Sequence, residues 1–166
     1  MAEEQDACIR TTVPRVRLES YRLESLHVEC QDSRASGPSD EAYECAVDWG
    51  AQESDAGRYL IWLSVLCRPP ADAPARFRSI GGMVWGTFAI TEGPPLEERE
   101  MLLAYNGAAI LHGVLRGLLI SATGGCAGGP FLLPTANYVE MAARRKKRQA
   151  EAGTAEESPE PSTISR

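Results

Sequence analysis

Four segments in the first part of the chain carry the pattern of β-strands. Residues 42–49 alternate apolar and polar side chains, which is typical of a strand with one exposed face. Residues 15–30 alternate less regularly, and residues 75–90 carry glycines that indicate a bent or bulged strand. Residues 59–67 are apolar at odd and at even positions, which predicts a strand covered on both faces. Because the strands follow one another at hairpin-like spacing, we expect an antiparallel meander.

The pattern changes to a helical period after residue 95. Apolar side chains recur at the spacing of one helix face, and a long helix is expected to end before residue 124. Between residues 108 and 120 the other faces are apolar as well, apart from His112 and Arg116. One sheet can cover only one side of such a helix, so we expect a partner subunit against the other side. The predicted oligomer interface consists of Ile110, Leu111, Val114, Leu115 and Leu118.

A glycine-rich loop and an apolar turn follow this helix. The predicted hinge loop contains Gly124, Gly125, Gly128 and Gly129. A shorter second helix is expected over residues 137–150, and residues 151–166 are expected to form a disordered acidic tail rich in Ser and Pro. Residues 1–14 are interpreted as a flexible arm. The sequence therefore predicts an α+β domain over residues 15–150, in which a four-stranded antiparallel sheet is packed by a long helix and a shorter C-terminal helix.

The composition of the chain argues against several classes of function. The net charge of −6 argues against nucleic-acid binding. No stretch reaches the about 18 consecutive apolar residues of a membrane span, and the N-terminus lacks the apolar core of a signal peptide, so we expect a cytoplasmic protein. No Cys-x-x-Cys pair occurs, and reduced thiols are expected rather than a disulfide or a metal site. The cysteines are Cys8, Cys30, Cys45, Cys67 and Cys126.

No catalytic arrangement can be assembled from these residues. The glycine loop lacks the Gly-Lys-Ser/Thr ending of a phosphate loop and follows a helix rather than a strand. With two histidines and no nucleophile elbow, no Ser-His-Asp triad is supported, and His112 is expected to be a satisfied core or interface residue. The basic run 144–148 suits a solvated helix end, with phosphate contact as the alternative. We therefore predict no enzyme activity, no metal and no cofactor.

Aromatic side chains lie on the second strand and on both sides of the apolar turn. Aromatic rings give a large contact area at low entropic cost, which suits a groove for extended polypeptide, although the same residues also suit a core. The glycine loop has two interpretations as well, a mobile flap over such a groove or a plain helix cap. We expect Phe131 and Tyr138, beside the loop, to belong to the groove.

Several of these motifs resemble the SecB family of protein-export chaperones and SecB-like chaperones. The strand that ends at residues 86–90 resembles the fourth strand of the family, and the order of four strands followed by two helices agrees. The resemblance is good over residues 76–142 and topological over residues 15–67. The matching residues are Asn106, Ile110, Leu111, Arg116, Thr123, Gly129, Pro130, Leu133, Pro134, Thr135, Ala136, Asn137 and Tyr138.

This resemblance implies a fold, an assembly and a binding surface. It implies a dimer of dimers with the long helix at its centre, and it implies binding of unfolded or nascent chains along grooves. Gly81 and Gly82 stand about where the export chaperone presents an acidic contact for the motor SecA, which argues against SecA as a partner. By position, the groove residues are Tyr43, Cys45, Val47, Trp49, Phe131, Leu132, Leu133, Tyr138 and Met141.

The predicted function is that of an ATP-independent holdase that keeps unfolded or nascent polypeptides soluble and competent for export or assembly. The alternative is a client-specific SecB-like chaperone dedicated to an antitoxin of a toxin–antitoxin pair. A ligand-binding protein or enzyme remains a third possibility if the groove closes into a pocket. None of the three requires membrane insertion or nucleic acid.

Overall fold

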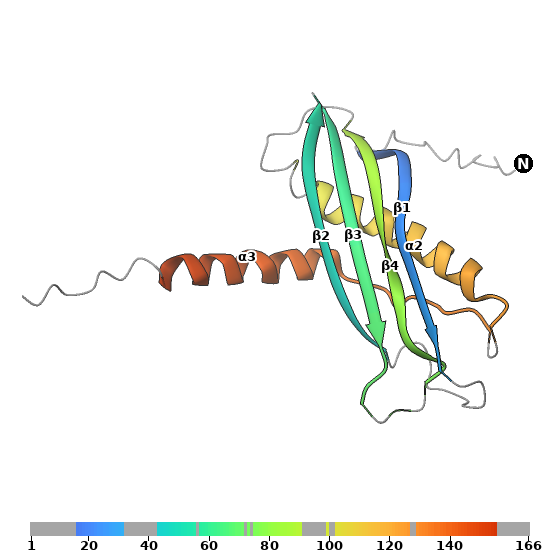
Figure 1. Ribbon diagram of the computed structural model, residues 1–166. Helices are drawn as coiled ribbons and strands as arrows, with labels where there is room; N and C mark the ends of the chain where they lie inside the picture. Colours follow the sequence, from blue (N-terminus) through green and yellow to red (C-terminus); the bar gives the residue numbers. More distant parts are fainter. Residues whose placement is uncertain are drawn as a thin grey trace, which may run out of the picture.

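The computed structural model describes residues 16–31, 43–55, 57–71, 73, 75–90, 99, 102–126 and 129–155. Four strands precede the helices, as the sequence predicts (Figure 1). The elements are β1 Val16–Cys30, β2 Glu44–Asp55, β3 Arg58–Arg68, β4 Phe77–Ile90, the π-helical segment η2 Leu103–Gly107, α2 Ala108–Thr123 and α3 Tyr138–Ala155. Because η2 leads directly into α2, the two form one continuous long helix. The predicted α+β fold class is confirmed.

The strand order β1-β4-β3-β2 differs from the predicted meander. The pairs β2–β3 and β3–β4 are antiparallel neighbours, as expected, but β1 pairs with β4 and not with β2. The connection from β1 to β2 therefore joins the two opposite edges of the sheet. Spacing along the chain could not reveal this, because it gives the length of a connection and not the edge that the next strand joins. As a result β1 and β2 are the edge strands.

The glycines of β4 make room for neighbouring elements and do not bulge the strand. The register between β3 and β4 runs without a shift from Arg58↔Ala89 to Cys67↔Ile80. Register shifts occur between β1 and β4, between Leu18 and Ser20 and again between Leu23 and Ser25. A Cβ atom at Gly81 would overlap with the carbonyl of Val65 on β3. The expectation of a bulge at these glycines is wrong, since close approach of the backbone at Gly81 and Gly82 and of side chains at Gly86 explains them instead.

The core lies between one face of the sheet and the helices. Buried and half-buried side chains alternate along β3, and Ile61, Leu63 and Cys67 are fully buried on the inner face. Trp62, on the outer face, is only half-buried and lies opposite Trp85 of β4 with 6.4 Å between ring centroids. Within the described residues, the helices cover a single face of the sheet (Figure 1), so the prediction that residues 59–67 are covered on both faces is wrong for the single chain.

Helix α2 packs its leucines against the glycines of β4. A Cβ atom at Gly86 would lie 2.8 Å from Cδ2 of Leu111, and one at Gly82 would lie 3.1 Å from Cδ1 of Leu115. Both leucines are fully buried within the single chain. They therefore belong to the core of the subunit, which corrects their assignment to an oligomer interface. The other three predicted interface residues, Ile110, Val114 and Leu118, are half-buried and stay a prediction.

Helix α3 is longer than predicted. It continues to Ala155, into the segment expected to be a disordered tail, and it projects past the β2 edge of the sheet (Figure 1). The predicted arm, residues 1–14, and the tail beyond residue 155 lie outside the described residues. Among the helices that are described, none is both long and apolar enough to cross a bilayer.

Candidate functional site

The turn between α2 and α3 is anchored in the core by Phe131. This side chain is fully buried and meets two rings edge-on, those of Tyr43 at 5.2 Å and Phe77 at 5.8 Å between centroids. Its backbone N–H donates to Oγ1 of Thr123 over 2.8 Å. The segment is extended, so Leu132 points outward and is 47% exposed. The predicted groove residues Tyr43 and Phe131 are thus buried core residues.

A second aromatic contact joins β2 to the start of α3. The ring of Trp49 meets the ring of Tyr138 edge-on with 5.4 Å between centroids, and both side chains are buried. The hydroxyl of Tyr138 donates to Nδ1 of His112 over 2.8 Å, and Nε2 of His112 donates to the carbonyl of Pro134 over 2.9 Å. A carbonyl can only accept, so Nε2 carries a proton, and in the neutral ring Nδ1 then accepts from the Tyr138 hydroxyl. The predicted satisfied histidine is confirmed.

Burial shifts the pKa values of both groups. Burial lowers the pKa of His112 below its ordinary value of 6.5, with a smaller contribution in the same direction from the nearby charge of Arg116. The hydrogen bond to Pro134 opposes this shift. Burial also raises the pKa of Tyr138. Both groups are therefore neutral in the folded protein near pH 7, and they link α2, the turn and α3.

The lowered pKa of His112 predicts a loss of stability in mild acid. The unfolded chain takes up a proton at its ordinary pKa of 6.5 while the folded chain does not, so the stabilisation is complete above that pH and is lost as the pH falls through the folded pKa. In His112→Gln the amide can keep both hydrogen bonds but does not titrate. Unfolding by denaturant at about pH 7.5 and about pH 5 should therefore show a smaller decline for the variant than for the wild type. Equal declines would contradict this role.

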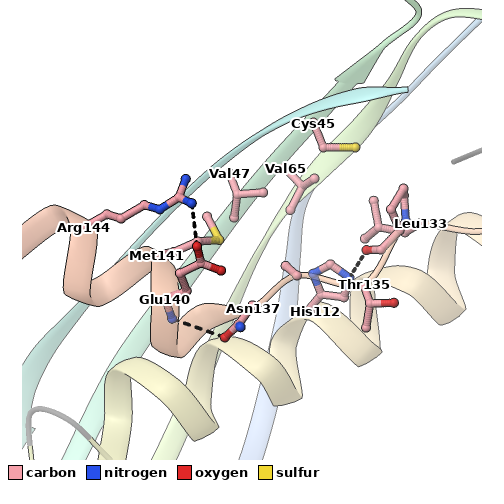
Figure 2. Close-up of a pocket in the computed structure, with 12 residues that line it drawn as sticks. Cys45, Val47, Val65, His112, Leu133, Thr135, Asn137, Glu140, Met141 and Arg144 are labelled. Carbon is pink, nitrogen blue, oxygen red and sulfur yellow. Dashed lines mark hydrogen bonds and ion pairs between the residues drawn. The ribbon is translucent and has the colours of Figure 1, made fainter. Parts of the chain in front are cut away.

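An open apolar surface remains between β2 and α3. A cavity of about 270 Å³ lies there, and Figure 2 shows Val47 and Val65 pointing from the strands toward Met141 and His112 on the helical side. A neighbouring hollow of about 550 Å³ continues along the same two elements, and the two share Val47, Met141 and Arg144. We call this continuous surface the β2–α3 groove. Its lining residues are Cys45, Val47, Asp48, Trp49, Val65, His112, Leu133, Pro134, Thr135, Ala136, Asn137, Glu140, Met141, Arg144, Arg145 and Arg148.

The predicted groove residues are only partly brought together here. Five of them, Cys45, Val47, Trp49, Leu133 and Met141, line the groove. The remaining four do not: three are buried, and Leu132 is exposed outside the groove. These four are Tyr43, Phe131, Leu132 and Tyr138.

Arginines form the rim of the groove. Nη1 of Arg145 donates to the carbonyl of Trp49 over 2.8 Å, and its guanidinium lies 5.7 Å from the centroid of the Trp49 ring. The same group lies 3.6 Å from the carboxylate of Asp48, in an exposed pair of little energetic weight. The expectation of a solvated helix end is therefore wrong for Arg145, which satisfies a backbone carbonyl of edge strand β2. Nothing in the sequence pairs Trp49 with Arg145, because only the packing of α3 on β2 brings them together.

A disulfide lies at the inner end of the groove. Cys45 and Cys67 face each other across β2 and β3 with 4.1 Å between their Cα atoms, and they are bonded. This corrects the expectation of reduced thiols throughout. The pairing follows from the register of the hairpin, which the cysteine spacing alone does not give. Cys30 and Cys126 are free, and Cys8 lies outside the described residues.

The glycine loop begins as a tight turn. The N–H of Cys126 donates to the carbonyl of Thr123 over 2.9 Å, which closes the end of α2 across Gly124 and Gly125. Gly129 has a φ of 86°, a conformation that favours glycine. Its carbonyl accepts from Arg76 over 3.0 Å. Gly128 lies outside the described residues. The contacts of the described part are those of a helix cap, and a flap stays a prediction.

Across the part of the chain that is described, no group of three His, Cys, Asp or Glu side chains could hold a metal ion. The groove instead combines an apolar floor, the backbone of an edge strand and a basic rim. Such a surface is suited to binding an extended peptide, since β2 is an edge strand of the described sheet and the floor offers contact for apolar side chains.

Comparison with known proteins identifies the fold. No protein-family model matches the chain, and no curated protein matches it in sequence. Among solved structures, the chain is similar to the Rv1957 SecB-like chaperone of Mycobacterium tuberculosis, solved with a ChAD peptide from the HigA1 antitoxin Rv1956. The TM-score is 0.53 at 17% identity, over 74% of this chain and 91% of that one.

A protein of unknown function from Streptococcus agalactiae matches with a TM-score of 0.43 at 17% identity, over 73% of this chain and 97% of that one. The match to the mycobacterial protein shows that the chain has the fold of a SecB-like chaperone, as the sequence motifs predict.

Proposed function

We propose that the protein is an ATP-independent chaperone that binds unfolded or nascent polypeptide in the β2–α3 groove. The observation that carries this proposal is the apolar groove beside an edge strand of the described sheet, in a fold shared with a chaperone solved with a peptide. An extended client segment would add to the β2 edge by backbone hydrogen bonds, and its side chains would enter the floor formed by Val47 and Met141. Binding of this kind needs no covalent chemistry and no cofactor.

Two features favour a dedicated client over general export. Arg148, on the rim beside the Arg144–Glu140 ion pair, suits a segment that carries carboxylates next to apolar side chains. Gly81 and Gly82 are buried within β4 and offer no side chain to a partner such as SecA. We therefore propose as the second candidate a chaperone specific for one partner. An antitoxin is the kind of partner that the similar mycobacterial protein binds.

Suppression of aggregation tests the proposal. A chemically unfolded protein is diluted into buffer with and without the purified chain, and turbidity is followed in the absence of nucleotide. A holdase is expected to abolish the turbidity at a fixed stoichiometry. A dedicated chaperone would suppress aggregation of its own partner and leave an unrelated protein unprotected. Aggregation that is unchanged for both kinds of protein would sink the proposal.

We further propose a cytoplasmic homo-oligomer, arranged as a dimer of dimers through α2. The support is the outward side of this helix, where Ala109, Gly113 and Gly117 are exposed and both glycines face open space. Exposed glycine weakens a helix by about 1 kcal/mol relative to alanine, so its repeated use suits close approach of a second helix. The half-buried side chains of Val114 and Leu118 flank this surface.

Leu118→Asp is expected to dissociate the proposed oligomer, because association would bury a carboxylate without a partner. Light scattering on the eluting protein should then give the subunit mass of 18.0 kDa in place of a multiple of it. Gln52→Asp adds the same charge at an exposed position of β2 and should leave the mass of the assembly unchanged. A wild type that elutes at the subunit mass would remove this interface from the account.

A further inference from the structure

Two free thiols from distant parts of the chain meet at one end of the sheet. Cys30 is the last residue of β1, and Cys126 lies in the turn that follows α2. Their side chains lie close enough for the Cys126 thiol to act on the titration of Cys30. Cys30 is exposed, whereas Cys126 is half-buried and packs against the hydrophobic core. Desolvation and the neighbouring sulfur of Cys126 raise the pKa of Cys30, as expected for two thiols in contact.

Backbone and aromatic contacts hold both cysteines in place. Cys30 lies opposite Phe77 in the β1–β4 pair, and the ring of Phe77 packs on Phe131 with 5.8 Å between centroids. The N–H of Cys126 donates to the carbonyl of Thr123 over 2.9 Å, and the carbonyl of Cys126 accepts from Gly129 over 3.1 Å. The two thiols thus belong to segments fixed on the same core.

A bridge of hydrogen bonds joins the same two segments. The N–H of Gln31, next to Cys30, donates to the carbonyl of Arg76 over 2.9 Å. Nη1 of Arg76 donates to the carbonyl of Gly129 over 3.0 Å. The end of β1 and the loop after α2 are therefore connected through the start of β4. The closeness of the two sulfurs is a consequence of this packing and does not depend on the thiols themselves.

We propose that Cys30 and Cys126 form a redox-active dithiol site that is oxidised to a disulfide by low-molecular-weight disulfides. The exposed thiolate of Cys30 attacks one sulfur of the small disulfide, which gives a mixed disulfide and releases one small thiolate. The thiolate of Cys126 then attacks the Cys30 sulfur, which forms the Cys30–Cys126 bond and releases the second small thiolate. The two cysteine protons end on the two released thiols. Two cysteines are oxidised, and one small disulfide is reduced to two thiols.

The exposure of Cys30 and Cys126 suits their different roles in this reaction. Exposure makes Cys30 the sulfur that an external disulfide can reach, while the half-buried Cys126 is placed to resolve the mixed disulfide. The bond would tie the end of β1 to the loop that leads to the buried Phe131. This site is separate from the Cys45–Cys67 disulfide, which joins β2 and β3, and it does not depend on the proposed chaperone function.

The test uses the full chain with Cys8→Ser, so that only the four described cysteines remain. The folded protein is equilibrated with graded mixtures of oxidised and reduced glutathione, quenched in acid, alkylated and mapped by mass spectrometry. We expect a peptide pair linked through Cys30 and Cys126, about 2 Da lighter than the two free-thiol peptides together. As the glutathione mixture becomes more oxidising, the alkylated forms of Cys30 and Cys126 should decrease together. In Cys30→Ser, Cys126 should be recovered without the link.

A displaced thiol provides the matched control. Cys30→Ser combined with Gln31→Cys keeps one exposed thiol in the same segment but moves it one residue along the chain, where the contact with Cys126 is lost. This variant is expected to accumulate the mixed disulfide with glutathione and to form little link to Cys126. The proposal is overturned if Cys30 and Cys126 stay fully alkylated in the glutathione mixtures in which the Cys45–Cys67 disulfide stays intact. It is equally overturned if the link forms as readily in the displaced variant, or if Cys30 stops at the mixed disulfide.

Discussion

Replacement of Phe131 by alanine is expected to lower the free energy of unfolding by about 3–5 kcal/mol. The side chain is fully buried and touches the rings of Tyr43 and Phe77, so its loss removes apolar burial and leaves a cavity between the sheet and the turn. The same contacts position the backbone hydrogen bond from Phe131 to Thr123. Unfolding in urea, followed by tryptophan fluorescence, gives the free-energy difference directly.

Leu132→Ala is the matched control, because this neighbour in the same segment is 47% exposed. Leu132→Ala is expected to lower the free energy of unfolding by no more than about 1 kcal/mol. Comparable costs for Phe131→Ala and Leu132→Ala would show that Phe131 is not held in the core in solution. The segment would then behave as the mobile flap that is one interpretation of the glycine loop, and the aromatic residues beneath it would become available to a client.

Val47→Thr combined with Met141→Gln is expected to weaken binding of an unfolded client at least about tenfold. These two residues lie in both hollows of the β2–α3 groove and are only half-buried, so near-isosteric polar replacements should leave the fold intact. An apolar client side chain entering the groove would have to desolvate the new hydroxyl and amide without hydrogen bonds in return. Titration of a labelled, permanently unfolded protein measures the change in Kd.

Ala46→Thr serves as the control for this pair. Ala46 is next to Val47 on β2, but its side chain is exposed on the opposite face of the strand. Its Kd should equal that of the wild type. If the double variant binds as tightly as the wild type while its circular dichroism and elution are unchanged, clients are bound elsewhere on the molecule and the groove assignment fails.

The local pattern of the sequence predicts the helices and strands well, but it does not predict which strands lie next to each other. The alternation over residues 42–49 and the helical period before residue 124 identify β2 and the long helix, because each pattern reflects one buried face. The pairing of β1 with β4 and the bond between Cys45 and Cys67 depend on strand order and register. Both are set by contacts between distant segments, and periodicity within one segment does not contain them.

The candidate site is predicted in part for a related reason. Aromatic residues beside a glycine loop suit a groove and a core equally, and the structure assigns Phe131 and Tyr138 to the core. Val47 and Met141, which the family resemblance assigns to the groove, both line the hollow between β2 and α3, and their role in binding stays a prediction. Arg145 was missed as a partner of Trp49, because its position depends on how far α3 extends beyond the sheet edge.

The central claim is that the folded chain takes up unfolded polypeptide without nucleotide. The most direct measurement is light scattering on the species that elutes from a sizing column. The protein is run alone, and then after mixing with a permanently unfolded protein or with a segment of its proposed dedicated partner. The account predicts an oligomer of the 18.0 kDa subunit that gains the mass of bound client and keeps it soluble. An unchanged mass, with every client eluting separately, would contradict the account and leave the shared fold as its only supported part.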